Sequence, residues 1–239
     1  MVSRKSFLNL SSVDIVPKLS VRIPTVGEIL EDESAYYSIA SSLTATPYQY
    51  MVQLDDMGKD YTDVTDYELF RMLFSVYAKS DLSFIFGNLD TSDFAVYIDN
   101  QSNSEILYSP SNDIKIDELV YNDLADTIRK INLFEKVKGK PGNEHAKKYL
   151  LDKERKKQKR NAKKPYEPYL ERLVIALVNT SEFPYDYDSC MDLSIYKFNQ
   201  SFRQIHHKIA FDKTMIGVYA GTVDTSKLSN KDALSWIPK

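Results

Sequence analysis

The chain has 239 residues, of which 43% are hydrophobic and 27% are charged, and its formal net charge is −3. This is the composition of an ordinary globular protein with enough apolar material for a core. Seven Gly and nine Pro exclude a collagen-like or low-complexity chain. The single cysteine, Cys190, excludes an intrachain disulfide and favours a reducing compartment.

No export or membrane signal is found along the sequence. The N-terminal stretch MVSRKSFLNLSSVDIVPKLS has neither an apolar core nor a small-residue cleavage site, so we expect no signal peptide. The longest apolar run, Leu173–Val178, is far shorter than the ~20 residues that cross a bilayer. We therefore expect a cytoplasmic protein without a membrane partner.

The charge is unevenly distributed. Residues 129–164 hold fifteen Lys or Arg against four Asp or Glu, a local net charge of +11. Because the whole chain has 31 basic and 34 acidic residues, the remainder carries sixteen against thirty, a net charge of −14. Such asymmetry indicates an electrostatic contact, either with another molecule or with the acidic body of the chain itself.

The N-terminal part reads as an extended segment followed by helices. Val13–Ile23 is predicted to be extended, as a peripheral strand or an arm. Two capping boxes, Thr25 with Glu28 and Thr65 with Glu68, each predict the start of a helix, because each member of such a pair accepts a hydrogen bond from the backbone of the other.

Helical patterns also fill the stretch between the two capping boxes. One is SAYYSIASSL, and another is YQYMVQLDDM, which follows Pro47 and ends before Gly58, the expected start and stop signals. The sequence after Thr65, YELFRMLFSVYAK, is apolar almost all round, which predicts a central, buried helix.

A short β region follows. Phe94–Ile98 and Glu105–Tyr108 predict a hairpin joined by the polar turn Asn100–Ser104, and Asp113–Ile116 predicts a third short strand. We therefore predict an α+β fold that is predominantly α-helical, with a small antiparallel sheet near residues 93–116.

The C-terminal half is predicted to be helical. A helix begins after Asp117, because four apolar residues recur at spacings of four, four and three: Val120, Leu124, Ile128 and Ile131. The turn GKPG precedes a basic helix over residues 143–164, which Pro165 ends. YLERLVIALVN is predicted to be another buried helix, separated by the loop SEFPYDYDS from the next.

The clearest apolar stripe lies in DLSIYKFNQSFRQIHHKIAF. Its members recur at spacings of three and four: Ile195, Phe198, Phe202, Ile205 and Ile209. Short separate segments are predicted at KTMIGVYAG and NKDALSWI. We predict a single domain over residues 1–239. Two subdomains, 1–116 with helices and the hairpin and 117–239 with a protruding basic helix, are the alternative.

No motif for catalysis, metal binding or cofactor binding is found. Neither phosphate-binding glycine pattern occurs, and a zinc site needs about four ligands where the chain has one Cys and three His. Cys190 beside His206 or His207 has the chemistry of a thiol–imidazole pair, but a buried structural cysteine is the commoner interpretation. We expect His206 to flank the apolar stripe and His207 to face outward.

Three acids, Asp186, Asp188 and Asp192, gather before the predicted C-terminal helix. One of them is expected to be the N-cap, because an N-cap carboxylate accepts a backbone N–H that the helix leaves unsatisfied. Few of the three carboxylates then remain for general acid–base catalysis. We expect no enzyme, no catalytic residue, no metal and no cofactor.

The basic helix is the candidate binding feature, since eight of the thirteen residues from Asp152 to Lys164 are Lys or Arg. The candidate contact residues are Lys153, Arg155, Lys156, Lys157, Lys159, Arg160, Lys163 and Lys164. A solvated helix face, a contact with an acidic protein and a contact with nucleic acid remain as interpretations. Nucleic acid is the least favoured, because no aromatic residue between Tyr149 and Tyr166 is available for stacking on bases.

Several stretches together resemble a group of proteins encoded among the tail genes of siphophages and prophages of Gram-positive bacteria. They are IPTVGEILEDE (23–33), SLTATPYQYMVQLDDMG (42–58), TDYELF (65–70), DLSIYKFNQSFRQI (192–205) and GVYAGT (217–222). The likeness spans nearly the whole chain, the basic stretch included. The resembled group offers no catalytic residues that could be transferred to this chain.

The resemblance implies a tail morphogenesis protein that works through protein contacts, as a tail assembly chaperone does. Such a chaperone holds the apolar tape-measure protein in the host cytoplasm until tail-tube subunits polymerise round it. The implied partners are the tape-measure or tail-tube protein, with a homo-oligomer as a further option. The alternatives are a structural virion protein of the tail, baseplate or connector, and a nucleic-acid-binding accessory protein that uses the basic helix.

Overall fold

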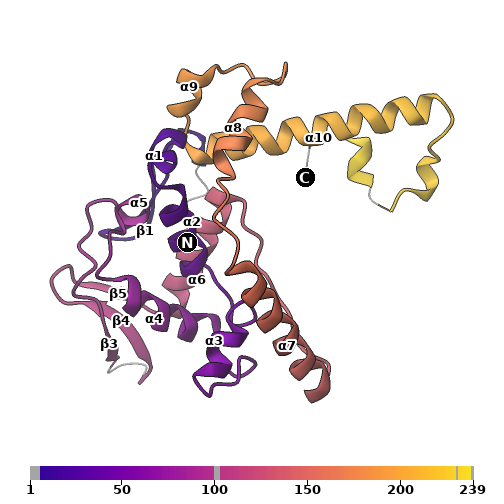
Figure 1. The fold of residues 1–239 in the computed structure, drawn as a ribbon. Coiled ribbons are helices and arrows are strands. Elements are labelled where there is room, and N and C mark those ends of the chain that lie inside the picture. Colours follow the sequence, from indigo (N-terminus) through magenta and orange to yellow (C-terminus); the bar gives the residue numbers. More distant parts are fainter. Residues whose placement is uncertain (1–5, 100–102, 230, 238–239) are drawn as a thin grey trace.

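The computed structural model describes residues 6–99, 103–229 and 231–237 (Figure 1). Helices account for 53% of the residues and strands for 10%, which confirms a mostly helical α+β fold. The strands are β1 Ser12–Val16, β2 Leu19–Arg22, β3 Ala95–Ile98, β4 Glu105–Ser109 and β5 Ile114–Ile116. The helices are α1 Val26–Glu31, α2 Glu33–Leu43, α3 Met51–Asp56, α4 Asp66–Tyr77, α5 Ser83–Phe86, α6 Glu118–Asn132, α7 Glu144–Asn161, α8 Leu170–Val178, α9 Tyr187–Met191 and α10 Ile195–Tyr219, with 3-10 turns η1 Phe7–Asn9, η2 Thr225–Lys227 and η3 Lys231–Leu234.

The predicted extended conformation of Val13–Ile23 is confirmed, but the segment forms a two-stranded hairpin with a buried face where a single peripheral strand or an arm was predicted. β1 pairs antiparallel with β2, and Val13 lies opposite Val21. The chain reverses at Lys18, whose φ is 69°. Because successive side chains of a strand point to opposite faces, one face carries Val13, Leu19 and Val21 into the core. That face packs on α6.

Both predicted capping boxes are confirmed. The Thr25 hydroxyl accepts a hydrogen bond from the Glu28 amide, and the Glu28 carboxylate accepts one from the Thr25 amide. Thr65 and Glu68 repeat this arrangement at the start of α4. α3 begins at Met51 and not at the predicted Pro47 position, because residues 47–50 form a turn.

Two helices predicted to be buried each expose one face. In α4, Phe70 and Phe74 are 1% exposed, whereas Val76 is 70% exposed. In α8, Leu170 is 1% exposed and Ile175 is 48% exposed. The sequence of α4 is apolar on nearly every side, so the neighbouring elements decide which of its sides is covered.

The predicted three-stranded sheet is confirmed, with the order β3-β4-β5 and both pairs antiparallel. β4 is central and β3 forms an exposed edge strand. Leu107 of β4 and Ile116 of β5 are opposite each other and fully buried. Of the predicted turn Asn100–Ser104, residues 100–102 lie outside the described part of the chain.

The main apolar core draws residues from Phe7 to Ile205. α6 carries the predicted stripe at its centre, since Leu124, Ile128 and Ile131 are at most 1% exposed and Val120 is half-buried. The N-terminal half of α10 packs against α6.

α10 differs from the prediction because it is one continuous helix of 25 residues. It runs through the segment KTMIGVYAG, which was predicted to be separate. Figure 1 shows the second half of α10 projecting away from the body, with the chain after it turning back. The segment that turns back is held by a hydrogen bond of 2.8 Å from the side-chain Nε2 of Gln204 to the Trp236 carbonyl. The predicted loop before α10 also contains a short helix, α9.

Candidate functional site: the basic helix and its surroundings

The basic helix α7 lies along one side of the body (Figure 1). Asn143 caps its start, where the side chain accepts a hydrogen bond of 2.8 Å from the Ala146 amide. The helix ends at Asn161, four residues before the predicted stop at Pro165. None of its residues is buried, and Leu150 and Leu151 attach it to a small apolar cluster around α3.

The inner side of α7 pairs with acidic residues of the body. Lys147 contacts Asp60, and the Arg155 guanidinium contacts Asp55 and Asp56 at 2.6 Å each. The ammonium of Lys147 helps to lower the pKa of Asp60 to about 2. Part of the charge asymmetry is therefore neutralised within the chain. Arg155, one of the predicted contact residues, is occupied by these two acids.

Replacing Lys147 with Gln is expected to raise the pKa of Asp60 from about 2 toward its ordinary value of 3.8. A carboxylate whose pKa is lowered by folding stabilises the native state above its unfolded pKa and loses that contribution as the pH falls through the folded pKa. The stability difference between wild type and variant should therefore be largest near neutral pH and shrink from about pH 4 to about pH 2.

Carbon-detected NMR titration of the Asp60 carboxylate, together with urea unfolding at several pH values, measures this effect. Lys148→Gln is the matched control, because Lys148 is exposed and has no ion-pair partner among the residues described. An Asp60 pKa that stays near 2 in the Lys147 variant would contradict the assignment of the shift to this ion pair.

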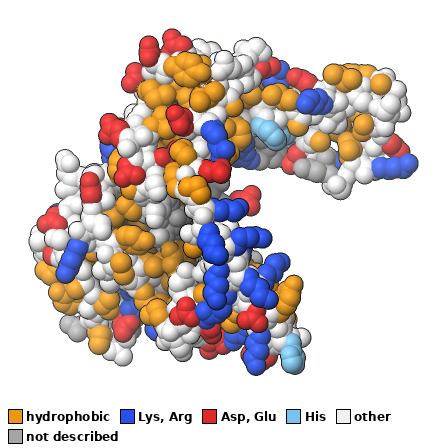
Figure 2. All heavy atoms as spheres, in the orientation of Figure 1, with side chains coloured by type: hydrophobic (Ala, Val, Ile, Leu, Met, Phe, Trp, Pro, Cys, Tyr) orange, Lys and Arg blue, Asp and Glu red, His pale blue; other side chains and the backbone are white. Residues whose placement is uncertain are grey.

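The rest of α7 and the residues after it carry a group of exposed cations. They are Lys153, Lys156, Lys157, Lys159, Arg160, Lys163 and Lys164. Lys157 lies 3.4 Å from Glu154, and the other six have no ion-pair partner within the described ranges. Figure 2 shows Lys and Arg side chains gathered along α7, on the side that borders the gap below the projecting α10. Of the eight predicted contact residues, seven are therefore accessible together.

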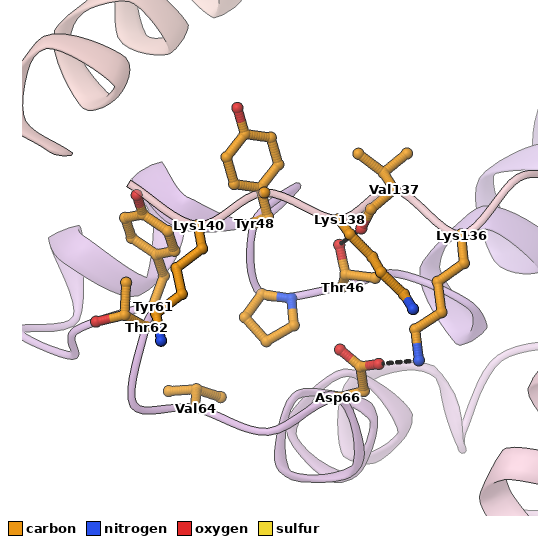
Figure 3. A pocket seen from close by; sticks show the side chains of 12 residues that line it. Thr46, Tyr48, Tyr61, Thr62, Val64, Asp66, Lys136, Val137, Lys138 and Lys140 are labelled. Carbon is orange, nitrogen blue, oxygen red and sulfur yellow. Dashed lines mark hydrogen bonds and ion pairs between the residues drawn. The ribbon is translucent and has the colours of Figure 1, made fainter. Parts of the chain in front are cut away.

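A hollow of about 340 Å³ lies where residues 133–142 cross the turn before α3 (Figure 3). The Thr46 hydroxyl donates a hydrogen bond of 2.8 Å to the Val137 carbonyl and ties the crossing segment down. Lys136 forms an ion pair of 2.6 Å with Asp66, while Lys138 also lines the hollow. This hollow is a surface site with mixed polar and apolar walls and a cationic rim.

A second hollow, of about 490 Å³, shares two wall residues, Tyr48 and Val137, with the first. Lys153 and Lys157 of α7 line it. Tyr48 thus stands between cations from α7 and cations of the crossing segment. The sequence showed no aromatic residue within the basic stretch, and folding supplies one from the turn before α3.

The remaining sequence candidates are structural. Cys190 is fully buried, and burial raises the pKa of its thiol, which disfavours the nucleophilic thiolate. His206 flanks the stripe beside Phe202, with ring centroids 6.1 Å apart, as predicted. His207 does not face outward: its Nε2 lies 2.6 Å from the Ser235 carbonyl, because the chain after α10 folds back over it.

Of the three acids before α10, Asp186 is an N-cap. Its carboxylate accepts a hydrogen bond of 2.9 Å from the Ser189 amide at the start of α9. A hydrogen bond from the Ser189 hydroxyl, followed by this one from the Ser189 amide, lowers the Asp186 pKa. Within residues 6–99, 103–229 and 231–237, no group of three or more His, Cys, Asp or Glu has a metal-binding arrangement. None of the helices described there has the length and apolar character needed to span a membrane.

Comparison with known proteins finds a match for the C-terminal third of the chain. Residues 156–239 match the family model described as the YomV second domain. The family is phage-derived, from a Bacillus prophage, so the match is consistent with a phage protein. It begins inside α7 and covers α8, α9, α10 and the segment that folds back. No curated protein and no solved structure matches the chain. The phage association is thus supported, and the tail role stays a prediction.

Proposed function

We propose that the chain is a non-enzymatic phage morphogenesis protein that binds other proteins, and that it acts as a tail assembly chaperone for the tape-measure protein. The C-terminal arm, defined as residues 206–237, carries this proposal. None of its described residues is buried, while Ile216 and Tyr219 are 69% and 84% exposed. A segment that buries so little apolar surface gains little to offset its conformational entropy. We therefore expect a partner to cover the arm.

Three further observations support this proposal. The resemblance to phage tail proteins covers nearly the whole chain, and the YomV second-domain match includes the arm. Exposed apolar side chains at the end of a projecting helix suit an apolar client. The exposed cations of α7 suit an acidic surface on the same assembly and keep the loaded complex soluble.

A capture experiment tests the arm. The tape-measure protein is co-expressed with the wild type or with a variant carrying Ile216→Ser and Tyr219→Ser. Because exposed anchor residues carry most of the energy of an interface, we expect the double variant to capture at least about tenfold less client. The matched control is Val76→Ser, since Val76 is a 70% exposed apolar residue on α4 that lies outside the arm.

Equal capture by the double variant and the control would contradict the role of the arm. Mass spectrometry of purified virions then separates the chaperone from its alternative. A chaperone is expected to be absent from mature particles, whereas a fixed stoichiometry in the particles identifies a structural tail, baseplate or connector protein.

Nucleic-acid binding is the second candidate, favoured by the position of Tyr48 between Lys138 and Lys153 in the two adjacent hollows. Cations on phosphates together with an aromatic ring for base stacking are the usual elements of single-strand binding. This function predicts a gel shift that weakens steeply with salt. It also predicts loss of that shift when the exposed lysines of residues 153–164 are replaced by Gln, and an unchanged shift would exclude it.

A further inference from the structure

A third hollow, of about 540 Å³, lies at the base of α10, beside the first residues of α2 and α8. Five aromatic side chains line it: Tyr37, Phe134, Tyr166, Tyr169 and Phe202. Glu33 and Glu167 line it as well, and no Lys or Arg is among its described lining residues. The hollow is therefore aromatic and carries only negative formal charge.

Glu33 is the unusual member of this lining, because its side chain is only 7% exposed. Its Oε1 accepts three hydrogen bonds, from the Tyr166 hydroxyl at 2.9 Å and from the amides of Tyr169 and Leu170 at 2.7 and 2.9 Å. Its Oε2 is buried and has no hydrogen-bond partner among the described residues. Buried carboxylate oxygens are nearly always paired, so Oε2 indicates a missing donor.

The surroundings of Oε2 restrict which donor fits. Aromatic rings attract cations through the negative potential of their faces, and carboxylates favour cations that donate hydrogen bonds. A neutral apolar ligand would leave Oε2 unpaired, and an anion would be repelled by Glu33 and Glu167. Burial, and after it the hydrogen bond to the Glu33 carboxylate and the charge of that carboxylate, raise the pKa of the Tyr166 hydroxyl to about 12.

We propose that this hollow binds an organic cation, with an ammonium or guanidinium group that lies against the rings of Tyr37, Tyr169 and Phe202 and pairs with the Glu33 carboxylate, whose buried Oε2 turns toward the hollow to receive it. The cation is the head of a Lys or Arg side chain of a partner, or a free amine with the same head group. This site is separate from the arm and from α7, so it stands or falls independently of the chaperone proposal.

NMR titration of the full chain with blocked arginine (N-acetyl-arginine methylamide) tests the proposal. The reporters are the amides of Tyr169 and Leu170, because both donate to Glu33. We expect saturable shifts at these amides. The citrulline derivative, which is neutral and has nearly the same shape, is expected to bind at least about tenfold more weakly.

Two variants locate the site. Glu33→Gln removes the charge and should abolish saturable binding. Tyr169→Leu removes one ring but keeps the main-chain hydrogen bond to Glu33, so it should fold normally and weaken binding about 3- to 30-fold. Tyr149→Leu is the matched control, because Tyr149 is a similarly exposed tyrosine on α7. If Glu33→Gln does not fold, comparing the arginine affinity of Tyr169→Leu with that of Tyr149→Leu still tests whether the hollow binds the cation.

Equal shifts with the arginine and citrulline derivatives, or the absence of saturation with arginine, would overturn the proposal. So would equal weakening by Tyr169→Leu and Tyr149→Leu. Methylguanidinium separates the two sources of the cation. Binding as tight as that of blocked arginine indicates a site for a free head group, and clearly weaker binding indicates a protein side chain.

Discussion

Replacing Phe198 with Ala is expected to lower the free energy of unfolding by about 3–5 kcal/mol, the usual cost of removing a buried phenylalanine. Phe198 is fully buried in the N-terminal half of α10, where this helix packs against α6. Its ring makes an edge-on contact with Phe183, with centroids 6.1 Å apart. Because Phe183 precedes α9, this contact joins the projecting helix both to the core and to the segment before it.

Urea unfolding measures this loss, and Tyr219→Ala is the control. Tyr219 is at the other end of the same helix and is 84% exposed, so its replacement should change stability by less than about 0.5 kcal/mol. The two variants also separate anchoring from binding, since Tyr219→Ala should impair client capture in a stable protein. A loss below about 1 kcal/mol for Phe198→Ala would show that α10 is not anchored through this ring.

The helix starts could be predicted because their signals are local. A capping box such as Thr25 with Glu28 needs only residues three apart, and both hydrogen bonds form within one turn. The buried face of α6 could also be predicted, since the spacing alone places Leu124 and Ile128 on one face of the helix. The exposed faces of α4 and α8 could not be predicted from the sequence. Val76 and Ile175 differ from their buried neighbours only in what the rest of the fold places beside them.

The candidate site was also predicted only in part, because local signals can be found in the sequence and contacts between distant residues cannot. The density of Lys and Arg predicted a basic helix, and that helix is present. Its internal partners were not predicted, because Arg155 meets Asp55 across 100 residues of sequence. The aromatic hollow had no sequence signal at all. Glu33 looks like an ordinary acid in the first turn of a helix, and its donors Tyr166 and Leu170 lie 133 and 137 residues away.

Replacing Glu33 with Leu is expected to cost about 2–4 kcal/mol of stability, because three donors lose their common acceptor in a buried place. Two of the donors are the Tyr169 and Leu170 amides at the start of α8, which have no intrahelical partner. Their hydrogen exchange should accelerate beyond the change in global stability. Glu31→Leu is the control, since Glu31 is an exposed glutamate two residues earlier and should change stability by less than about 0.5 kcal/mol.

Glu33→Gln separates the structural role of this side chain from cation binding. The amide keeps one carbonyl oxygen that can accept from α8, so its stability cost should be closer to about 1 kcal/mol. It cannot supply the negative charge for a cation. If Glu33 only caps α8, Glu33→Leu should lower the free energy of unfolding far more than Glu33→Gln. The wild type should then show no saturable arginine binding. If it also binds a cation, Gln should fold well and still lose arginine binding, because the helix needs an acceptor while the ligand needs a charge.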